Sequence, residues 1–548
     1  MLDWLKMLPW LHDHALSVLI FAPLAGAGLL ALPAFGPERD LESRRARAFA
    51  LMVTLLVFLL SLGILAGFDP AARHQYEETH PWMPMFGISY ALGLDGIALA
   101  LVMLTTLLMP IVVVASAAIK RRGRGYLACM LFLETAVLGS LLSLDLFLFY
   151  VFWEAMLAPM YFIIGIWGGE RRVHAALKFV LYTVGGSFLM LIALFYLAWR
   201  FQQQTGEVSF LLERLLQTRL GAAEEIWLFA AFALAFGIKV PIFPLHTWLP
   251  DAHVEAPTGG SVVLAGILLK MGIFGFLRFA YPLFPRAALV CAPWLGLLAI
   301  IGIVYGALVA WAQTDIKKMI AYSSVSHLGY CVLGLAACSA AALSGAVFQM
   351  LSHGFTTGAL FLIVGVLYER RHTREIGEYG GLASRMPLFA FCFLVFTLGS
   401  IALPLTTGFI GEFLILSGSY PRFPILTAAA LLGVILGAVY MLTLYMRTMY
   451  GEIDGAKNGT LADLRAREVF TLAPLLVLVL ALGVYPQPVL SRVTPAVTAL
   501  VQKMAERRES LAAGAAERRR QRNPRVRLDT LPVRTGEALP ADHAGAVL

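Results

Sequence analysis

Long apolar segments separated by short polar connections recur along most of the chain. A segment of about 20 apolar residues is long enough to cross the hydrocarbon core of a membrane as a helix. Counting such segments predicts an all-α polytopic membrane protein with about 14 transmembrane helices. The segments lie near residues 15–35, 48–68, 90–119, 126–143, 146–167, 175–199, 226–249, 260–281, 287–312, 319–338, 341–367, 387–418, 424–449 and 468–487.

Lysine and arginine are distributed unevenly over the connections. The odd-numbered loops, which follow predicted helices 1, 3, 5 and so on, carry clusters such as Lys120–Arg124 and Arg370–Arg374, whereas the even-numbered loops carry few cations. Loops rich in Lys and Arg stay on the cytoplasmic side of the membrane. We therefore expect the odd loops to be cytoplasmic. Because the number of predicted helices is even, both termini are expected on the other side of the membrane, away from the cytoplasm.

The composition excludes an ordinary soluble protein, because 59% of the residues are hydrophobic and only 14% are charged, against about 25% charged in soluble domains. The net charge of +8 reflects the loops and a basic C-terminal tail, so we expect the lipid bilayer as a partner and no nucleic acid. The five cysteines form no CxxC pair, and neither GxGxxG after a strand nor a Walker motif occurs. We therefore expect no metal, cofactor or redox active site on this chain.

Two predicted helices are interrupted in similar ways. Pro241 and Pro244 break helix 7, and Pro404 with Gly408 breaks helix 12. Paired interruptions in the two halves of a transporter indicate an inverted repeat with the ion path at the breaks. We expect two inverted five-helix repeats, helices 4–8 and 9–13. The predicted divisions are helices 1–3 in 1–125, the repeats in 126–285 and 286–450, the last loop and helix 14 in 451–490, and a basic, largely disordered tail in 491–548.

Several ionisable residues fall inside the predicted helices. Each such group costs about 2.5–3.5 kcal/mol on insertion scales, so it needs a partner, a hydrated cavity or a function. Their order along the chain suggests a line of proton-exchanging groups, in which the carboxylate of helix 5 favours the charged form of the lysine of helix 7 and the histidines act as relays. The candidates are Glu154, Lys239, Lys270, His327, His353 and Glu412.

Structural interpretations compete with this hypothesis. A single intramembrane Glu or Lys can form a buried structural ion pair, and a helical His such as His327 or His353 can be a core residue satisfied by hydrogen bonds. Lys317 and Lys318, at the start of predicted helix 10, fit interfacial anchors. Glu134, deep in predicted helix 4, is left open.

Longer motifs carry a resemblance to a known family. The segment Lys239–Thr258, which reads KVPIFPLHTWLPDAHVEAPT, closely resembles the antiporter-like subunits of respiratory complex I, and within them the M type of bacterial NADH:quinone oxidoreductase. Phe152–Met156, Trp167–Arg172, Thr314–Gly329 and Gly408–Phe413 resemble further motifs of that family. The resemblance extends over roughly residues 85–490.

The resemblance implies roles for individual residues. The family's proton-transfer residues fall on Glu154, Lys239, Lys270 and Glu412, and its histidines on His327 and His353. It implies a proton-translocating subunit whose FMN, iron–sulfur clusters and quinone lie on other subunits, with L- and N-type antiporter-like neighbours. Glu412 favours the M type, because L, N and Mrp-type subunits usually have lysine there. A membrane subunit of a hydrogenase-linked or Mrp-type cation/proton antiporter complex is the alternative, and a passive scaffold with its charges locked in ion pairs is a further one.

Overall fold

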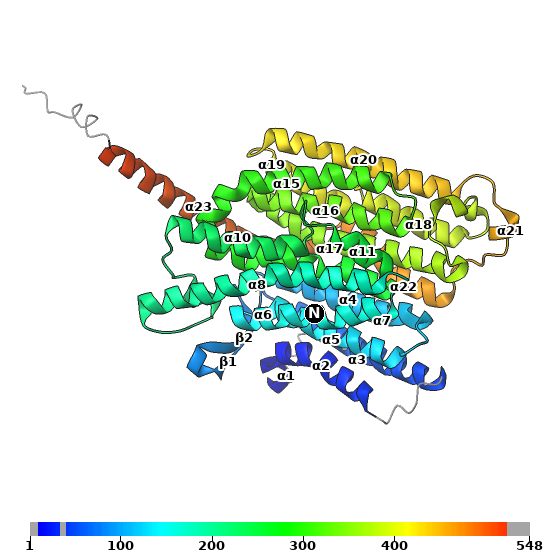
Figure 1. The fold of residues 1–548 in the computed structure, drawn as a ribbon, viewed down its shortest axis with the longest axis horizontal. Helices are drawn as coiled ribbons and strands as arrows, with labels where there is room; N and C mark the ends of the chain where they lie inside the picture. The colour runs from blue at the N-terminus through cyan, green and yellow to red at the C-terminus, as the bar shows by residue number, and fades with distance from the viewer. Residues whose placement is uncertain (1–8, 33–39, 523–548) are drawn as a thin grey trace, which may run out of the picture.

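The computed structural model describes residues 9–32 and 40–522, and it is a bundle of long, roughly parallel helices (Figure 1). The first half of the bundle contains α1 (Pro9–Asp13), α2 (Ala15–Ala31), α3 (Asp40–Gly67), α4 (Gly96–Ala115), α5 (Gly123–Leu142), α6 (Leu146–Ala155), α7 (Leu157–Trp167), α8 (Arg172–Thr205), α9 (Leu212–Leu215), α10 (Ala222–Lys239), α11 (Trp248–Glu255), α12 (Thr258–Val263), α13 (Lys270–Gly275) and α14 (Tyr281–Leu283). Two π-helical turns, Leu264–Leu268 and Phe276–Ala280, flank α13, so α12 to α14 form one continuous rod.

The second half of the bundle also consists of long helices and one broken helix. It contains α15 (Pro285–Trp311), α16 (Ile316–Ala337), α17 (Ala340–Arg371), α18 (Pro387–Ser400), α19 (Thr407–Ser419), α20 (Pro424–Met449), α21 (Gly455–Asn458), α22 (Ala466–Val484) and α23 (Gln487–Arg522). Short 3-10 turns occupy Pro84–Phe86, Ser116–Ala118, Ile376–Glu378 and Leu382–Ser384.

Eleven helices in the described part of the chain are long and apolar enough to cross a membrane. The apolar helices α2 and α18 are shorter. The prediction of about 14 crossings therefore stays a prediction, because the remaining segments are short helices or pieces of broken ones. Both breaks lie where the sequence predicts them, between α10 and α11 and between α18 and α19.

The rod α12–α14 and helix α17 lie at the centre of the bundle, since their most apolar windows are entirely buried. Helix α8 lies at the rim and exposes large apolar side chains, with Leu181 70% and Phe188 57% exposed. Exposed leucine and phenylalanine on a spanning helix are compatible with lipid rather than water. The bundle thus has a packed centre that contains the polar groups and an apolar perimeter that suits a bilayer.

The all-α prediction is wrong between residues 75 and 94. There β1 (Gln75–Met83) and β2 (Ile88–Leu94) form an antiparallel hairpin. Gly87 closes the turn with a φ of +67°, and a Cβ there would lie 2.2 Å from the carbonyl oxygen of Val208. Residues Ile88–Leu94 therefore form a strand, and the next helix begins only at Gly96, not near residue 90.

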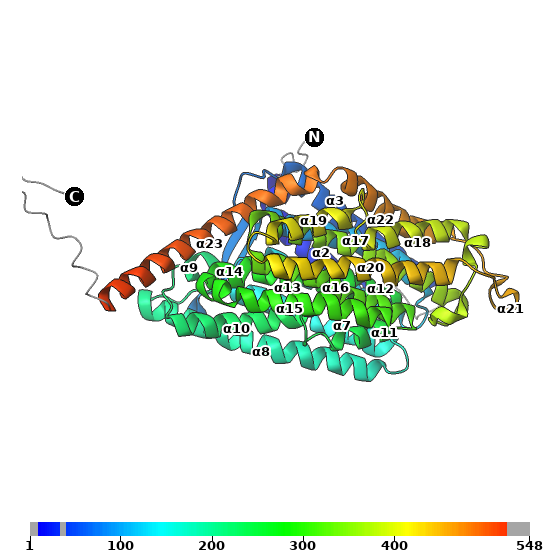
Figure 2. The same ribbon diagram turned by 90° about the horizontal axis from the view of Figure 1, so that it is seen from above.

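The expectation of a largely disordered tail is also wrong for its first part. Helix α23 runs to Arg522 and leaves the bundle obliquely (Figure 2). Its beginning packs on α4, where the carbonyl oxygen of Arg492 would lie 1.8 Å from a Cβ at Gly96. Only glycine permits this approach. Residues 523–548 of the predicted tail lie outside the described part of the chain.

We call the end of the bundle that holds the hairpin, the start of α4 and the start of α23 the hairpin end. At the opposite end, the guanidinium of Arg370 binds Glu468 through two hydrogen bonds of 2.7 and 3.1 Å. This pair joins α17 to α22 and is almost buried, with side chains 11% and 6% exposed.

A candidate proton path through the bundle

Glu154 lies where α6 passes into α7, next to Trp153. The carboxylate interacts with Ser187 of α8 and electrostatically with Lys239. Its Oε1 atom has no hydrogen-bond partner among the described residues. Glu154 is therefore held near Lys239 without being locked to it.

Lys239 is the last residue of α10 and is only 1% exposed. The helix ends here because Pro241 lacks a backbone donor and its ring disfavours a continuing helix. Trp248 of α11 donates to the carbonyl of Ile238 at 3.0 Å, which satisfies one backbone acceptor that the break leaves free. The break thus places the lysine side chain at the centre of the bundle without leaving that carbonyl unpaired.

The ammonium of Lys239 faces two aromatic rings. Its Nζ lies 5.1 Å from the ring centre of Trp153 and 5.8 Å from that of Phe179. Within the described residues Nζ has no hydrogen-bond partner. A buried cation with only ring faces and one nearby carboxylate is weakly stabilised.

Lys270 begins α13, between the two π-helical turns. Its ammonium donates to the carbonyl of Ala265, in the first of these turns, and lies 2.6 Å from Nδ1 of His353 on α17. A π-turn shifts the backbone hydrogen bonds and frees such a carbonyl for a side chain. The local helix geometry therefore orients Lys270 towards α17.

The line continues from His353 to Glu412. The rings of His353 and His327 have centres 6.0 Å apart. Nδ1 of His327, on α16, lies 3.1 Å from Oε1 of Glu412 on α19, and Gln349 donates to the same oxygen at 3.1 Å. Side chains from α13, α17, α16 and α19 thus form one buried polar chain.

His327 has polar neighbours on both ring nitrogens. Nε2 lies 3.2 Å from the hydroxyl of Ser400 and 3.4 Å from that of Tyr440. An imidazole with partners on both sides can accept a proton at one nitrogen and release it from the other. These contacts fit a relay and fit equally a core histidine that is satisfied by hydrogen bonds.

The sequence-based prediction did not single out His253 of α11 as a site residue. It is fully buried and stacks on Phe361 with ring centres 4.7 Å apart. Neither ring nitrogen has a hydrogen-bond partner among the described residues, and the ring interacts electrostatically with Lys270 and Lys317. The sequence offered one signal for His253. It lies in the motif Lys239–Thr258, in the helix that follows the break.

Lys317 differs from the expected interfacial anchor. Its side chain is 7% exposed and its ammonium donates to the carbonyl of Ala256 at 2.5 Å, whereas Lys318 is exposed. The start of α16 therefore contributes one buried cation next to the end of α11.

Glu134 of α5 is also buried, and neither of its carboxylate oxygens has a hydrogen-bond partner among the described residues.

Comparison with known proteins gives matches over most of the chain. Residues 143–437 match the family described as "NADH:quinone oxidoreductase/Mrp antiporter, TM". The chain is similar to NADH-quinone oxidoreductase subunit M of Rhodobacter capsulatus, with 46% identity over 502 residues, which cover 89% of this chain and 97% of that protein.

Solved structures agree with this assignment. A chain of respiratory complex I from Thermus thermophilus, solved with bound NADH, superimposes with a TM-score of 0.81 and 35% identity, covering 89% of this chain and 99% of that one. A chain of the Mrp complex from Dietzia matches with a TM-score of 0.75 at 24% identity and covers 88% of this chain and 52% of that one, which shows a shared fold. The chain therefore belongs to the NADH:quinone oxidoreductase/Mrp antiporter transmembrane family, and within it to the subunit M family of NADH-quinone oxidoreductase.

Proposed function

We propose that this chain is a proton-translocating membrane subunit of NADH:quinone oxidoreductase, respiratory complex I. The observation that carries the proposal is the buried chain of contacts from Lys270 through His353 and His327 to Glu412. Membership of the subunit M family supports the assignment of this path to NADH:quinone oxidoreductase.

The residues have distinct roles in the proposed path. Glu154 is the coupling carboxylate, whose approach favours the charged form of Lys239 and whose withdrawal favours release of its proton. Lys239 is the central carrier and Lys270 the connecting carrier. His353 and His327 relay the proton to Glu412, which acts as the acid near the exit or towards the next subunit.

Energy for translocation comes from other subunits in this proposal. NADH oxidation and quinone reduction take place there, with FMN, iron–sulfur clusters and quinone, and this chain holds no redox site. Neighbouring subunits, especially the L- and N-type antiporter-like ones, bias this chain between two states that differ in proton affinity. The electrostatic contact between Glu154 and Lys239, which is not locked by a hydrogen bond, is suited to respond to such a bias.

The proposed topology has 14 crossings, with the five-helix units formed by helices 4–8 and 9–13 in inverted orientation. In the structure the candidate units run from α5 to α14 and from α15 to α20, and each has its break in the fourth crossing, at α10–α11 and at α18–α19. An odd number of helices per unit is what an inverted relation requires. Both termini are placed on the periplasmic side of a bacterial inner membrane by the charge of the loops.

The proposed function is tested by purifying the tagged protein from its native membrane in mild detergent. We expect comigration with NADH:quinone reductase activity and with flavin and iron–sulfur subunits. Comigration with a hydrogenase, or with other antiporter subunits alone, would contradict the complex I assignment while keeping the proton path. The path itself is tested by proton pumping of the reconstituted complex.

A further inference from the structure

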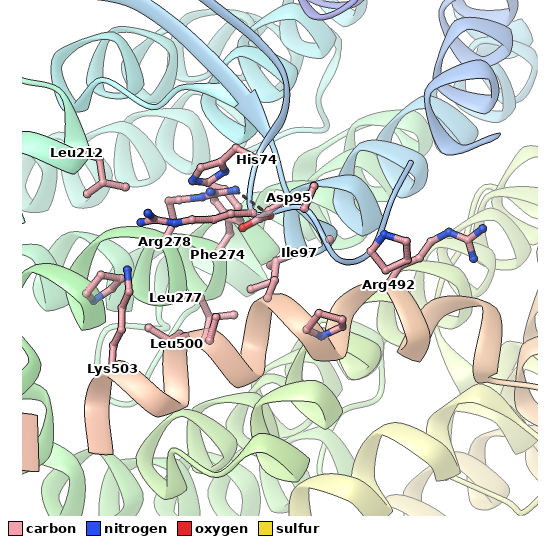
Figure 3. Close-up of a pocket in the computed structure, with 18 of the residues that line it drawn as sticks. His74, Asp95, Ile97, Leu212, Phe274, Leu277, Arg278, Arg492, Leu500 and Lys503 are labelled. Carbon is pink, nitrogen blue, oxygen red and sulfur yellow. Dashed lines mark ion pairs between the residues drawn. The ribbon is translucent and has the colours of Figure 1, made fainter. Parts of the chain in front are cut away.

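Two cavities meet at the hairpin end of the bundle. The first, of about 310 Å³, lies beneath α23 and we call it the cationic cavity. One carboxylate, Asp95, faces it, and the basic side chains that line it are Arg73, His74, Arg278, Arg492 and Lys503 (Figure 3). The second, of about 290 Å³, we call the apolar groove. Both cavities share Gly96 and Arg492.

The apolar groove follows α4 into the membrane. Leucine, methionine and phenylalanine side chains of α3, α4, α17 and α22 line it, together with the beginning of α23, and Arg492 is its one charged lining residue within the described part of the chain. From Gly96 to Leu107 the helix rises about 16 Å, which matches one leaflet of a hydrocarbon core about 30 Å thick. The groove therefore has the length and polarity that suit an acyl chain.

Arg492 lies at the mouth of this groove and forms no ion pair with another of the described residues. Arg278 is paired with Asp95 at 2.9 Å, and Arg73 with Glu213 at 3.1 Å. Arg492 donates to the carbonyl of Pro488 at 2.7 Å, whereas its buried Nε has no hydrogen-bond partner among the described residues. In Figure 3 its side chain points away from the Arg278–Asp95 pair, so it does not share that carboxylate.

The lining of the cationic cavity contains more basic than acidic side chains. The pKa of His74 is lowered to about 4, first by burial and then by the neighbouring Arg278, whose effect is larger than the opposite effect of Asp95. An anion entering beside Arg492 would thus meet a favourable field, and a planar guanidinium binds phosphate oxygens in pairs. A molecule that combines a phosphate with a leaflet-length apolar chain would satisfy both cavities at once.

We propose that the apolar groove and Arg492 bind one phospholipid with an anionic headgroup, its phosphate on the guanidinium and an acyl chain along α4. Phospholipid is the occupant favoured over a protein helix, because the membrane supplies it at high concentration and because the mouth carries an unpaired cation. The bound lipid fills the space between α3, α4 and α22 and bridges them to the beginning of α23. This inference is independent of the proposed proton path.

The test uses the intact complex that contains the full chain, delipidated in detergent and titrated with lipid under native mass spectrometry. Phosphatidylglycerol is the anionic probe, phosphatidylcholine the zwitterionic one and glycerol phosphate the headgroup without chains. We expect saturable phosphatidylglycerol binding that Arg492→Gln weakens about tenfold and Arg492→Lys weakens less. Ala100→Phe, which fills the groove, should weaken binding of both lipids, and Arg219→Gln, an exposed arginine at the same end, should change nothing.

Three results would overturn the proposal. The first is equal phosphatidylglycerol binding by the wild type, Arg492→Gln and Ala100→Phe. The second is competition by glycerol phosphate that is insensitive to Ala100→Phe, which would indicate a soluble phosphate site. The third is an electron cryo-microscopy map of the complex in which a neighbouring protein segment fills the groove. That map also decides the question if a variant fails to assemble, because density for a headgroup at Arg492 and a chain along α4 in the wild type supports the proposal.

Discussion

Replacing Lys239 by methionine separates a proton carrier from a structural ion pair. Methionine keeps the length and apolar body of the side chain but removes the charge. If Lys239 and Glu154 formed a locked buried pair, removal of one partner would destabilise the protein by about 3–5 kcal/mol. A passive scaffold therefore predicts a lower melting temperature and loss of assembly.

The observed surroundings of Lys239 predict that removing its charge does not lower the stability of the protein. Its Nζ has no hydrogen bond to a described residue, and two ring faces at 5.1 and 5.8 Å contribute about 0.5–2 kcal/mol each. Burying an ammonium costs several kcal/mol. Because the cost of burying the ammonium is at least as large as what the rings return, we expect Lys239→Met to leave the free energy of unfolding unchanged or slightly raised, while proton pumping is lost.

A second variant of Lys239 separates the effect of proton release from the effect of the positive charge. Lys239→Arg keeps the cation, but a guanidinium does not release its proton in a protein. A carrier role therefore predicts that both variants assemble and neither pumps, whereas a purely electrostatic role predicts that arginine restores pumping. Lys318→Met, at an exposed lysine of α16, is the matched control.

The assay measures dye-detected proton uptake by proteoliposomes of the complex, normalised to NADH oxidation, together with the apparent melting temperature of the complex. We expect pumping to fall at least tenfold in both Lys239 variants and the melting temperature to stay within a few degrees of wild type. A strongly destabilised Lys239→Met, or wild-type pumping by Lys239→Arg, would refute the reasoning.

Three further predictions concern stability and are read from thermal unfolding of the complex. Arg370→Met leaves the nearly buried Glu468 unpaired and should cost about 3–5 kcal/mol, most of which Arg370→Met/Glu468→Met restores; equal loss in both variants would contradict this. Gly433→Ala places a Cβ 2.2 Å from a side-chain carbon of α15 and should cost about 1–3 kcal/mol; an unchanged melting temperature would show that α15 yields. Because the pKa of His74 is lowered to about 4 from about 6.5, the folded chain binds fewer protons than the unfolded one between these values, so stability should fall by up to about 3 kcal/mol as pH drops from 6.5 to 4, and His74→Asn should flatten this dependence.

The sequence located the buried charges and the helix breaks better than it located the elements of the periphery. Buried charges in apolar segments are conspicuous because each is costly, so Lys239, Lys270 and Glu412 could be selected without knowledge of the fold. Prolines after Lys239 located the break for a similar reason, since their effect on a helix is local. Both signals depend on only a few neighbouring residues.

The features that sequence reasoning missed depend on contacts between distant segments. The hairpin at 75–94 is held by residues such as Phe210, whose backbone donates to the carbonyl of Gly87 at 3.2 Å. Helix α23 is polar enough to suggest disorder, yet its beginning is fixed by the approach to Gly96. Likewise, no local pattern distinguishes the buried Lys317 from the exposed Lys318 beside it.

The candidate path is divided at the crossing of α10 and α13. From Lys270 onward, groups lie within hydrogen-bonding distance or in ring contact, whereas Lys239 faces Trp153 and Glu154 instead of Lys270. At the crossing itself the two backbones nearly touch, because a Cβ at Gly272 would lie 2.5 Å from the carbonyl oxygen of Phe236. Transfer between the two lysines therefore depends on the spacing of this crossing.

Gly272→Ala tests this dependence without removing any ionisable group. The added methyl must push α13 away from α10, at a cost of about 1–3 kcal/mol, and so widen the step between Lys239 and Lys270. We expect assembly to persist and pumping per NADH oxidised to fall several-fold, whereas Gly185→Ala, at a helical glycine of α8 with open space around it, should change neither. Full pumping by an assembled Gly272→Ala complex would show that protons do not pass from Lys239 to Lys270 across this crossing, and the path would then consist of two separate halves.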